Sequence, residues 1–351
     1  MDKMYLEDCC EILDSMRIQI TASDRKEGPY PYYGANGIQD YVVDYIFDDE
    51  LVLLAEDGGN FGSKEKTIAY RVSGKCWVNN HAHVLKPKDG LNVDYLCYSL
   101  MFYNVDGMVN GATRQKLTQA AMRRMAIPKR TFDEQICIVD KLNKVVEIKK
   151  KRQIELEELD KLIKSRFVEM FGDPDINDKD WDVYKMEQLC EVGSSKRIYQ
   201  NEQSMSGVPF LRISDLVNRM DTGSKKCDLY IPQERFEELK KQGLVPASGD
   251  ILLTARGTLG RCYIIQEDDE FYFQDGMITW LSKFDTKITP LYISYLFEMP
   301  GFRKQIDSLQ IGSTVAYLSI LMTKNLDVMV PPFELQNQFA DFVHQVDKSK
   351  F

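Results

Sequence analysis

The glycine-rich stretch EDGGNFGSK, residues 56–64, has the composition of a loop that could hold phosphate groups. A phosphate-binding P-loop follows the pattern G-x-x-x-x-G-K-[ST], in which backbone N–H groups and the lysine contact the phosphate oxygens. Here Ser63 separates Gly62 from Lys64, so the pattern fails. We therefore interpret residues 56–64 as a loop between two strands that binds no nucleotide.

Two histidines with the spacing of metal ligands occur in NNHAHV, residues 79–84. Alternate residues of a strand point to the same face, so His81 and His83 would lie side by side. A zinc site needs further ligands, but the only other histidine is His344 and none of the eight cysteines forms a C-x-x-C pair. The sequence therefore predicts no metal site, and favours hydrogen bonds within the fold or contact with a ligand for these histidines.

Two further stretches resemble parts of enzymes that act on DNA. VPPF, residues 330–333, is similar to the N/D-P-P-Y/F motif of adenine methyltransferases, but Val330 cannot hold the target amine and no glycine loop for S-adenosylmethionine is evident. The acidic stretch DPDINDKD, residues 173–180, mixes aspartate with Pro, Asn and Lys, which is typical of a turn. We expect no catalytic residue and no cofactor-binding residue in this chain.

The composition indicates a folded protein of more than one domain. The chain has 351 residues, of which 44% are hydrophobic, and its formal net charge is −9. This charge argues against a protein that coats nucleic acid through bulk positive charge, although a local basic surface can still contact phosphates. The sequence pattern indicates that the cysteines are free thiols. No apolar run long enough to span a membrane and no signal peptide are evident, so we expect a cytoplasmic protein.

An internal repeat with an offset of 201 residues organises the chain. GATRQKL at residues 111–117 returns as GSTVAYL at residues 312–318, and the same offset carries Gln135 onto Gln336. Upstream the offset drifts, as loops of different length would make it. There, CEI, PYYG and ELVLLAEDGGNFG (residues 10–12, 31–34 and 50–62) match CEV, PFLR and DILLTARGTLG (residues 190–192, 209–212 and 250–260). The sequence therefore predicts two copies of one plan, divided at the turn of residues 171–181.

A long helix should connect the two copies. Residues 132–170 contain neither Gly nor Pro, and apolar residues such as Ile138, Leu142 and Val145 alternate in steps of four and three, as in a coiled-coil seam. The second copy offers a helix with the same spacing that could pack antiparallel to the first. It has about half the length, so part of the first apolar seam has no predicted partner within the chain.

These features together resemble the specificity (S) subunit of a type I DNA restriction-modification enzyme. The resemblance covers nearly the whole chain and depends on the order of its parts. The stretches that carry it are residues 29–62, 76–87, 127–135, 167–174, 208–216 and 330–336.

The resemblance implies an α+β fold with two target-recognition domains of mixed strands and helices. Each is followed by a conserved helix, and the two helices form an antiparallel coiled coil whose second member is short. The implied parts are residues 1–130, 131–172, 173–331 and 332–351, in the order first domain, first helix, second domain, second helix. The chain would recognise a bipartite DNA site, with one half per domain, and would itself be non-catalytic.

The resemblance also implies partners. Two modification (M) subunits would dock on the helices, and restriction (R) subunits would join through the complex. S-adenosylmethionine, ATP and Mg would be bound by those partner subunits. Two alternatives stay open: a truncated specificity protein that dimerises or titrates modification subunits, and a DNA methyltransferase or nuclease in its own right.

Candidate DNA contacts follow from residue type and place. Arginine can bridge O6 and N7 of guanine, so Arg256 and Arg261 in TARGTLGR are the preferred base-reading candidates. A salt bridge or a non-specific phosphate contact is the alternative for each. The full set of candidates is Asn36, Asn60, Lys64, His81, Arg114, Lys116, Lys196, Arg197, Arg212, Arg256 and Arg261.

Overall fold

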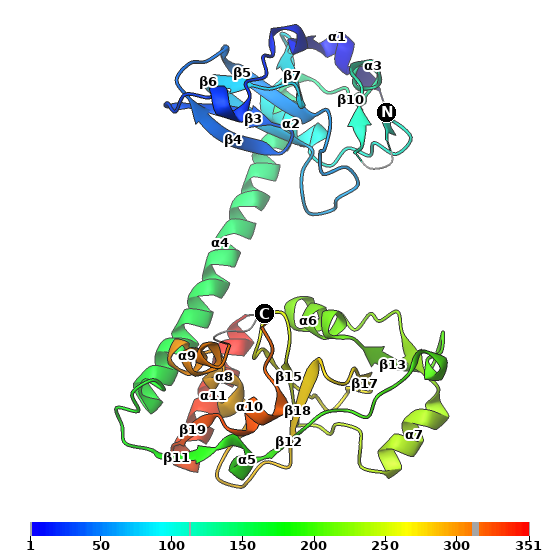
Figure 1. The fold of residues 1–351 in the computed structure, drawn as a ribbon. Coiled ribbons are helices and arrows are strands. Elements are labelled where there is room, and N and C mark those ends of the chain that lie inside the picture. The colour runs from blue at the N-terminus through cyan, green and yellow to red at the C-terminus, as the bar shows by residue number, and fades with distance from the viewer. Residues whose placement is uncertain (1, 112–113, 311–315, 351) are drawn as a thin grey trace. The chain divides into compact units, whose positions relative to one another are not determined.

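The computed structural model describes residues 2–111, 114–310 and 316–350. The chain forms two compact units, Met1–Arg152 and Gln153–Phe351, here called unit 1 and unit 2. The division lies inside the 40-residue helix α4 (Phe132–Phe171), so each unit contains part of this helix (Figure 1). The absence of Gly and Pro lets the helix run without a break, and Gly172, in the left-handed region at φ 82°, follows its last residue.

Unit 1 is built on a six-stranded sheet in the order β2-β7-β5-β6-β3-β4. All neighbours are antiparallel except β3 and β6, which are parallel. The central strand β5 ends in the buried run LVLLA, which fits a strand covered on both faces. The strands are β2 (Cys10–Ile12), β3 (Tyr30–Gly34), β4 (Gly37–Val42), β5 (Phe47–Ala55), β6 (Ala69–Val78) and β7 (Ala82–Pro87).

Short elements complete unit 1 around this sheet. Helix α2 (Val93–Leu100) begins at Asn92, whose side chain accepts hydrogen bonds from two backbone N–H groups. The remaining elements are β1 (Lys3–Tyr5), α1 (Leu6–Cys9), β8 (Val109–Asn110), β9 (Lys116–Leu117), α3 (Gln119–Arg123) and β10 (Ala126–Pro128). Single 3-10 turns lie at Asp14–Met16 and Ala22–Asp24. Strand β1 pairs with β10, so the start of the chain is joined to the segment that leads into α4.

Unit 2 repeats the strand order of unit 1. Its four-stranded sheet runs β12-β18-β15-β16, and a three-stranded sheet runs β14-β13-β17, with β13 and β17 parallel as β3 and β6 are. The strands are β12 (Glu191–Gly193), β13 (Val208–Leu211), β14 (Tyr230–Ile231), β15 (Ile251–Thr254), β16 (Cys262–Ile264), β17 (Tyr272–Phe273) and β18 (Ile278–Ser282). The continuous strand β6 of unit 1 therefore corresponds to two strands, β16 and β17, of unit 2.

Along the chain, the helices of unit 2 alternate with its strands and follow them. They are α5 (Met186–Leu189), α6 (Ile213–Thr222), α7 (Gln233–Lys241), α8 (Pro290–Leu296), α9 (Pro300–Ser308), α10 (Ile320–Lys324) and α11 (Phe333–Ser349), with a 3-10 turn at Gln200–Glu202. Strand β11 (Asp182–Lys185) pairs antiparallel with β19 (Asp327–Val330), as β1 pairs with β10. The acidic residues 173–180 form a turn in which Asp173 N donates to Asp178 Oδ1 at 2.7 Å.

Equivalent side chains make the same hydrogen bonds in the two units. Gln135 Oε1 accepts from the backbone N–H of Asn92, and Gln336 Oε1 accepts from that of Thr289, both at 2.8 Å. These are the two glutamines that the offset of 201 residues superposes. The repeat therefore extends from the sequence to the fold, although residues 112–113 and 311–315 of its two named stretches lie outside the described residues.

Helix α11 packs antiparallel against the last part of α4. The buried Phe339 ring lies 5.5 Å from Phe167 and 5.3 Å from Phe171, measured between ring centroids. Further along α11, Lys350 pairs with Asp160 at 2.7 Å, which is one to three turns earlier in α4. The direction is therefore opposite in the two helices, and the predicted antiparallel pair is confirmed.

The middle of α4 exposes apolar side chains. Val145 is 61% exposed and Ile148 is 65% exposed, whereas Ile163, on the same predicted seam as Val145, is buried. The predicted seam thus begins at Ile138 against the core of unit 1, is exposed around Val145, and is buried again at Ile163 in the core of unit 2. Among the described residues, no helix combines the length and apolar character that crossing a bilayer requires.

Candidate nucleic-acid interface

The loop that follows β5 is held by its own side chains. Asn36 Nδ2 donates to the carbonyl of Gly58 at 3.0 Å, and Asn60 Nδ2 donates to that of Thr67 at 3.2 Å. Gly58 has a φ of 62°, which a residue with a side chain adopts at a cost. Both asparagines named as candidate DNA contacts thus shape the loop, while Lys64 is exposed and makes no ion pair with any residue that the structure describes.

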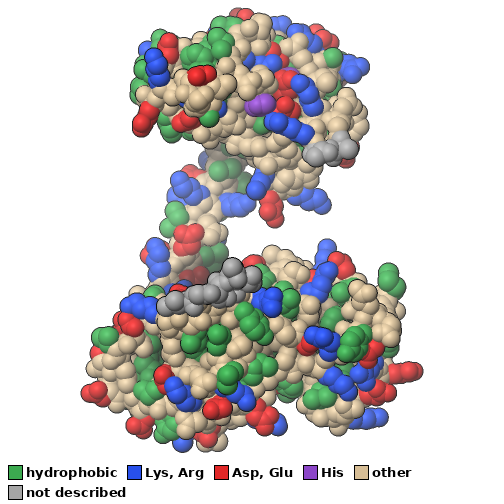
Figure 2. All heavy atoms as spheres, in the orientation of Figure 1, with side chains coloured by type: hydrophobic (Ala, Val, Ile, Leu, Met, Phe, Trp, Pro, Cys, Tyr) green, Lys and Arg blue, Asp and Glu red, His purple; other side chains and the backbone are tan. Residues whose placement is uncertain are grey.

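Three of the candidate residues converge on the acidic start of this loop. Asp57 Oδ1 lies 2.6 Å from His81 Nδ1 and 2.9 Å from Arg114 Nη2. Lys116 Nζ pairs with Glu56 Oε1 at 2.9 Å. His81, Arg114 and Lys116 therefore form one group that is partly exposed, anchored on two carboxylates. In the orientation of Figure 2, Lys and Arg side chains gather beside a histidine on this unit.

A buried ion network lies directly beneath. His83 Nδ1 contacts Asp14 Oδ2 at 2.7 Å, and its Nε2 contacts the carbonyl of Leu117 at 2.9 Å. Both ring nitrogens of His83 are therefore engaged within the fold. Arg17 joins the network through Glu56 Oε2 at 2.6 Å. Three charged side chains, those of Arg17, Asp14 and Glu56, thus meet His83 below the loop.

This network does not fit a metal ion. Asp14, Glu56 and His83 form the one group of potential ligands that lie close enough together within the described parts of the chain. However, Arg17 donates to Glu56, Gln119 Nε2 donates to Asp14 Oδ2 at 2.8 Å, and both His83 nitrogens are engaged. An arginine occupies the position that a cation would take. The network is a scaffold for the loop, and His83 acts within the fold.

The network makes unit 1 sensitive to acid. Burial raises the pKa of Asp14, but hydrogen bonds from His83 and Gln119 outweigh it, so the pKa lies below its usual value. Burial also raises the pKa of Glu56, but the hydrogen bonds from Arg17 and Lys116 lower it by more, so the pKa of Glu56 also lies below its usual value. These two carboxylates therefore stabilise folded unit 1 fully at a pH above their pKa values in the unfolded chain, which are about 4. The stabilisation is lost as the pH falls through their lower pKa values in the folded protein.

We expect hydrogen-exchange protection of β5 and β7 in unit 1 to fall below about pH 4, before that of β15 and β18 in unit 2. Unit 2 is the internal control, because Ser194, Ala255 and Thr279 occupy the positions of Asp14, Glu56 and His83. Exchange measured by mass spectrometry at a series of pH values, corrected for intrinsic rates, tests this. Simultaneous loss in both units would contradict a role for the network.

Unit 2 places an exposed arginine at the equivalent loop. Arg256 and Tyr317 form an isolated antiparallel bridge, and the Arg256 guanidinium carbon lies 4.9 Å from the centre of the Tyr317 ring. The two side chains line a hollow of about 500 Å³ together with Gln203, Gln274 and Arg197. No carboxylate that the structure describes forms an ion pair with Arg256, so its charge faces the hollow.

The other candidate arginines of unit 2 are paired with carboxylates. Arg261 Nη2 lies 2.6 Å from Asp221, and Arg197 Nε lies 3.0 Å from Asp275. Arg212 contacts Asp215 through both Nε and Nη2, at 2.9 and 3.1 Å, at the beginning of α6. The salt-bridge alternative therefore describes these arginines here, and their contact with DNA stays a prediction. Lys196 is exposed, and its backbone N–H donates to the Tyr272 hydroxyl at 2.8 Å.

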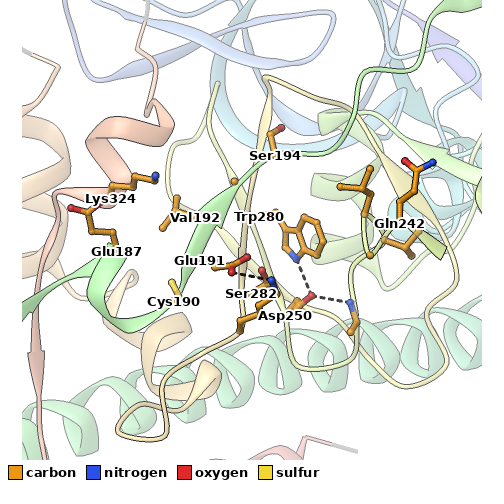
Figure 3. A pocket seen from close by; sticks show the side chains of 16 residues that line it. Glu187, Cys190, Glu191, Val192, Ser194, Gln242, Asp250, Trp280, Ser282 and Lys324 are labelled. Carbon is orange, nitrogen blue, oxygen red and sulfur yellow. Dashed lines mark hydrogen bonds and ion pairs between the residues drawn. The ribbon is translucent and has the colours of Figure 1, made fainter. Parts of the chain in front are cut away.

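A larger hollow of about 770 Å³ lies elsewhere in unit 2, beside β12 and β18 (Figure 3). Its indole, Trp280, donates to Asp250 Oδ2 at 2.9 Å, and burial raises the pKa of Asp250. The thiol of Cys190 lines the hollow, and burial raises its pKa to about 12, so it is not a nucleophile at neutral pH. The lining also includes Glu191 and Lys283, whose exposed side chains pair with each other at 2.9 Å.

Sequence analysis missed Asp57 and Tyr317, which hold Arg114 and Arg256. The repeat carried part of the signal, because an offset of 201 residues places Tyr317 on Lys116. Arg256 is placed on Asp57 by the structure, since matching Ala55 with Ala255 in the sequence would place it on Glu56. Asp57 and Lys116 form an isolated bridge in unit 1, just as Arg256 and Tyr317 do in unit 2. The repeat thus marks one position in both units.

Comparison with known proteins identifies relatives across the whole chain. A family model described as "Type I restriction modification DNA specificity domain" matches residues 1–158 and again residues 178–351. The specificity subunit S.HindORF215P of a type I restriction enzyme from Haemophilus influenzae is 31% identical over 97% of this chain and 86% of its own length. The MjaVIII specificity subunit of Methanocaldococcus jannaschii is 23% identical over 93% of this chain and 81% of its own length.

Solved structures share the fold. The S subunit of a type I restriction-modification system from M. genitalium superposes with a TM-score of 0.56 and 14% identity, covering 99% of this chain and 90% of the other. A chain from a study of assembly and conformational transition of the type I system has a TM-score of 0.54 and 13% identity, with the same coverage. The two-unit α+β architecture is thus that of a known fold.

Proposed function

This chain belongs to the type I restriction-modification DNA specificity family, and from that membership we propose that its two units read the two halves of one bipartite DNA site. Family members supply DNA sequence specificity to a restriction-modification complex and are not catalytic themselves. The observation that carries the proposal is the repeated fold with different side chains at its repeated loop. Asp57 and Lys116 in unit 1 stand where Arg256 and Tyr317 stand in unit 2.

The proposed parts follow the sequence division. Residues 1–130 and 173–331 are the two target-recognition domains, and residues 131–172 and 332–351 are the helices that follow them. The packing of α11 on α4 supports this, because it joins the second helix to the first through buried aromatic rings. A rigid helix between the recognition domains would set the distance between the half-sites.

The proposed DNA surface of unit 1 consists of His81, Arg114, Lys116 and Lys64, with Asn36 and Asn60 shaping the loop beneath. In unit 2 it consists of Arg256, Lys196 and Arg197, together with Arg212 and Arg261. Salt bridges such as Arg261 to Asp221 can exchange for phosphate contacts, since both partners are partly exposed. The overall charge of −9 makes these local cations the main attraction for phosphate groups.

Specificity subunits act within complexes that contain DNA and other subunits. For this chain we propose two modification subunits docked on the helices, with restriction subunits joining through the complex, in the cytoplasm. The exposed apolar residues of α4, such as Val145 and Ile148, support a docking surface. S-adenosylmethionine, ATP and Mg would then be bound by the partner subunits.

Methylome sequencing of cells that carry this chain and its modification partner tests the function. We expect adenine methylation at a motif of two short blocks separated by a fixed unspecified gap, and its loss when this chain is deleted. Replacing residues 173–331 with the corresponding part of a relative should change one block only. A continuous motif would contradict the proposal, and stoichiometric binding of S-adenosylmethionine by the isolated chain would favour the methyltransferase alternative.

A further inference from the structure

We infer that each unit presents one guanine-reading arginine beside the same bridge of the repeated fold, Arg114 in unit 1 and Arg256 in unit 2. This inference rests on the proposed function and deepens it, because it names the position and the base that it recognises. Three observations support it: the two bridges are equivalent, each guanidinium has a support beneath it, and each arginine keeps donors free.

The two bridges are equivalent in backbone geometry; Arg256 is itself a member of its bridge, whereas Arg114 precedes the bridge residue Lys116 by two positions. Leu117 N donates to the carbonyl of Glu56 at 2.7 Å, and Leu318 N donates to that of Ala255 at 3.0 Å. The residue after each carbonyl forms the isolated bridge, which is Asp57 with Lys116 in unit 1 and Arg256 with Tyr317 in unit 2.

A glycine then follows on the loop side of each bridge. Gly58 and Gly257 have φ angles of 62° and 72°, so the chain turns in the same left-handed manner in both units. The same turn is therefore built twice with different side chains.

In unit 2 the guanidinium rests on an aromatic ring. Its carbon lies 4.9 Å from the centre of the Tyr317 ring, a contact that uses the face of the guanidinium and not its N–H edge. Gln203 and Gln274 line the same hollow and could contact the neighbouring base. Arg256 thus keeps its donor edge available while the ring restricts its orientation.

In unit 1 the guanidinium rests on a carboxylate and a glycine. Arg114 is 60% exposed, and only its Nη2 contacts Asp57, at 2.9 Å. The missing side chain of Gly58 makes the room, because a Cβ there would lie 3.3 Å from Arg114 Nε. His81 binds the same Asp57 oxygen at 2.6 Å and so keeps the carboxylate in place.

The donors that remain free differ among the candidate arginines. Arg212 uses both Nε and Nη2 for Asp215, so one donor edge is fully occupied. Arg197 and Arg261 each give one nitrogen to a carboxylate, as Arg114 does, but the Arg261 side chain is only 30% exposed, whereas that of Arg114 is 60% exposed. A bidentate contact with O6 and N7 of guanine needs two adjacent donors, which Arg256 can supply without an ion pair to any described carboxylate, and Arg114 through the N–H groups that Asp57 leaves free.

Lysine substitutions separate base reading from simple charge. In cells that carry this chain and its modification partner, we expect Arg256→Lys to make one guanine position degenerate in one block of the methylated motif. Arg114→Lys should do so in the other block. The preference for guanine should fall about 10-fold or more, because lysine keeps the charge but not the paired donors. Arg235→Lys is the matched control, because Arg235 is paired with Glu202 and Glu238 outside the proposed DNA surface, and it should leave both blocks unchanged.

Three outcomes would overturn the inference while leaving the proposed function intact. In the first, the wild-type motif is bipartite and keeps its guanines in both lysine variants. In the second, either block of the motif lacks a G·C pair. In the third, one variant changes both blocks equally. A wild-type strain without a bipartite motif would instead contradict the proposed function. Methylation levels at fully matched sites, measured in the same cells, report whether each variant is folded and assembled.

Discussion

Replacing Phe339 with alanine is expected to lower the free energy of unfolding of unit 2 by about 3–5 kcal/mol, the range for a buried phenylalanine whose cavity cannot collapse. Phe339 is fully buried, and its ring contacts Phe167, Phe171 and Tyr295 at 5.3–5.5 Å. These rings join α11 to α4 and to α8, so the cavity would open where three helices meet. Urea unfolding, followed by circular dichroism and by hydrogen exchange of α11, measures the effect.

Phe333→Ala is the control for this substitution. Phe333 begins the same helix but is 47% exposed, so its removal should change the free energy of unfolding much less. Modification activity at the bipartite site should also fall for Phe339→Ala, because the helices would no longer be held together. Equal destabilisation by the two substitutions would show that the aromatic cluster does not anchor α11.

Removing the central carboxylate of the buried network should destabilise unit 1 by a similar amount. In Asp14→Ala, the His83 ring, the Gln119 amide and the Val84 N–H lose their partner at once. Each buried polar group left without a partner costs about 1–3 kcal/mol, so the three together should cost about 3–5 kcal/mol. Because His83 also holds the carbonyl of Leu117, next to Lys116, the loop that carries Arg114 should lose its position, and DNA binding should weaken.

Ser194→Ala, at the equivalent position of unit 2, is the matched control. Ser194 Oγ donates to the carbonyl of Ile278 at 3.2 Å and is neutral, so its loss should cost about 1 kcal/mol. Thermal and urea unfolding of both variants at pH 7 makes the comparison. A small effect of Asp14→Ala, or one as small as that of Ser194→Ala, would mean that water replaces the carboxylate and that the network does not support the loop.

Much of the architecture could be predicted from the sequence because it depends on local or periodic features. The absence of Gly and Pro over residues 132–170 predicted α4, and the structure places it at Phe132–Phe171. The offset of 201 residues superposed Gln135 and Gln336, which make the same hydrogen bond in both units. The broken phosphate-loop pattern at Ser63 correctly indicated an ordinary loop between β5 and β6.

The network of unit 1 could not be predicted, because its members are far apart in the chain. Asp57 meets His81 across 24 residues and Arg114 across 57, and Asp14 meets Gln119 across 105. His83 looked equal to His81 in the sequence. They differ because His83 lies within β7, paired with Leu54, whereas His81 lies in the turn before that strand, beside the exposed Arg114.

Sequence alone thus determined the duplicated plan and the helix that joins its copies, since both depend on spacing along the chain. Tertiary structure alone decided which cations are available. Arg197, Arg212, Arg256 and Arg261 are equivalent by residue type, and three of them are paired with Asp275, Asp215 and Asp221. Arg256 differs because folding brings a tyrosine ring to it instead of a carboxylate, and such a pairing depends on distances in space that the order of residues does not encode locally.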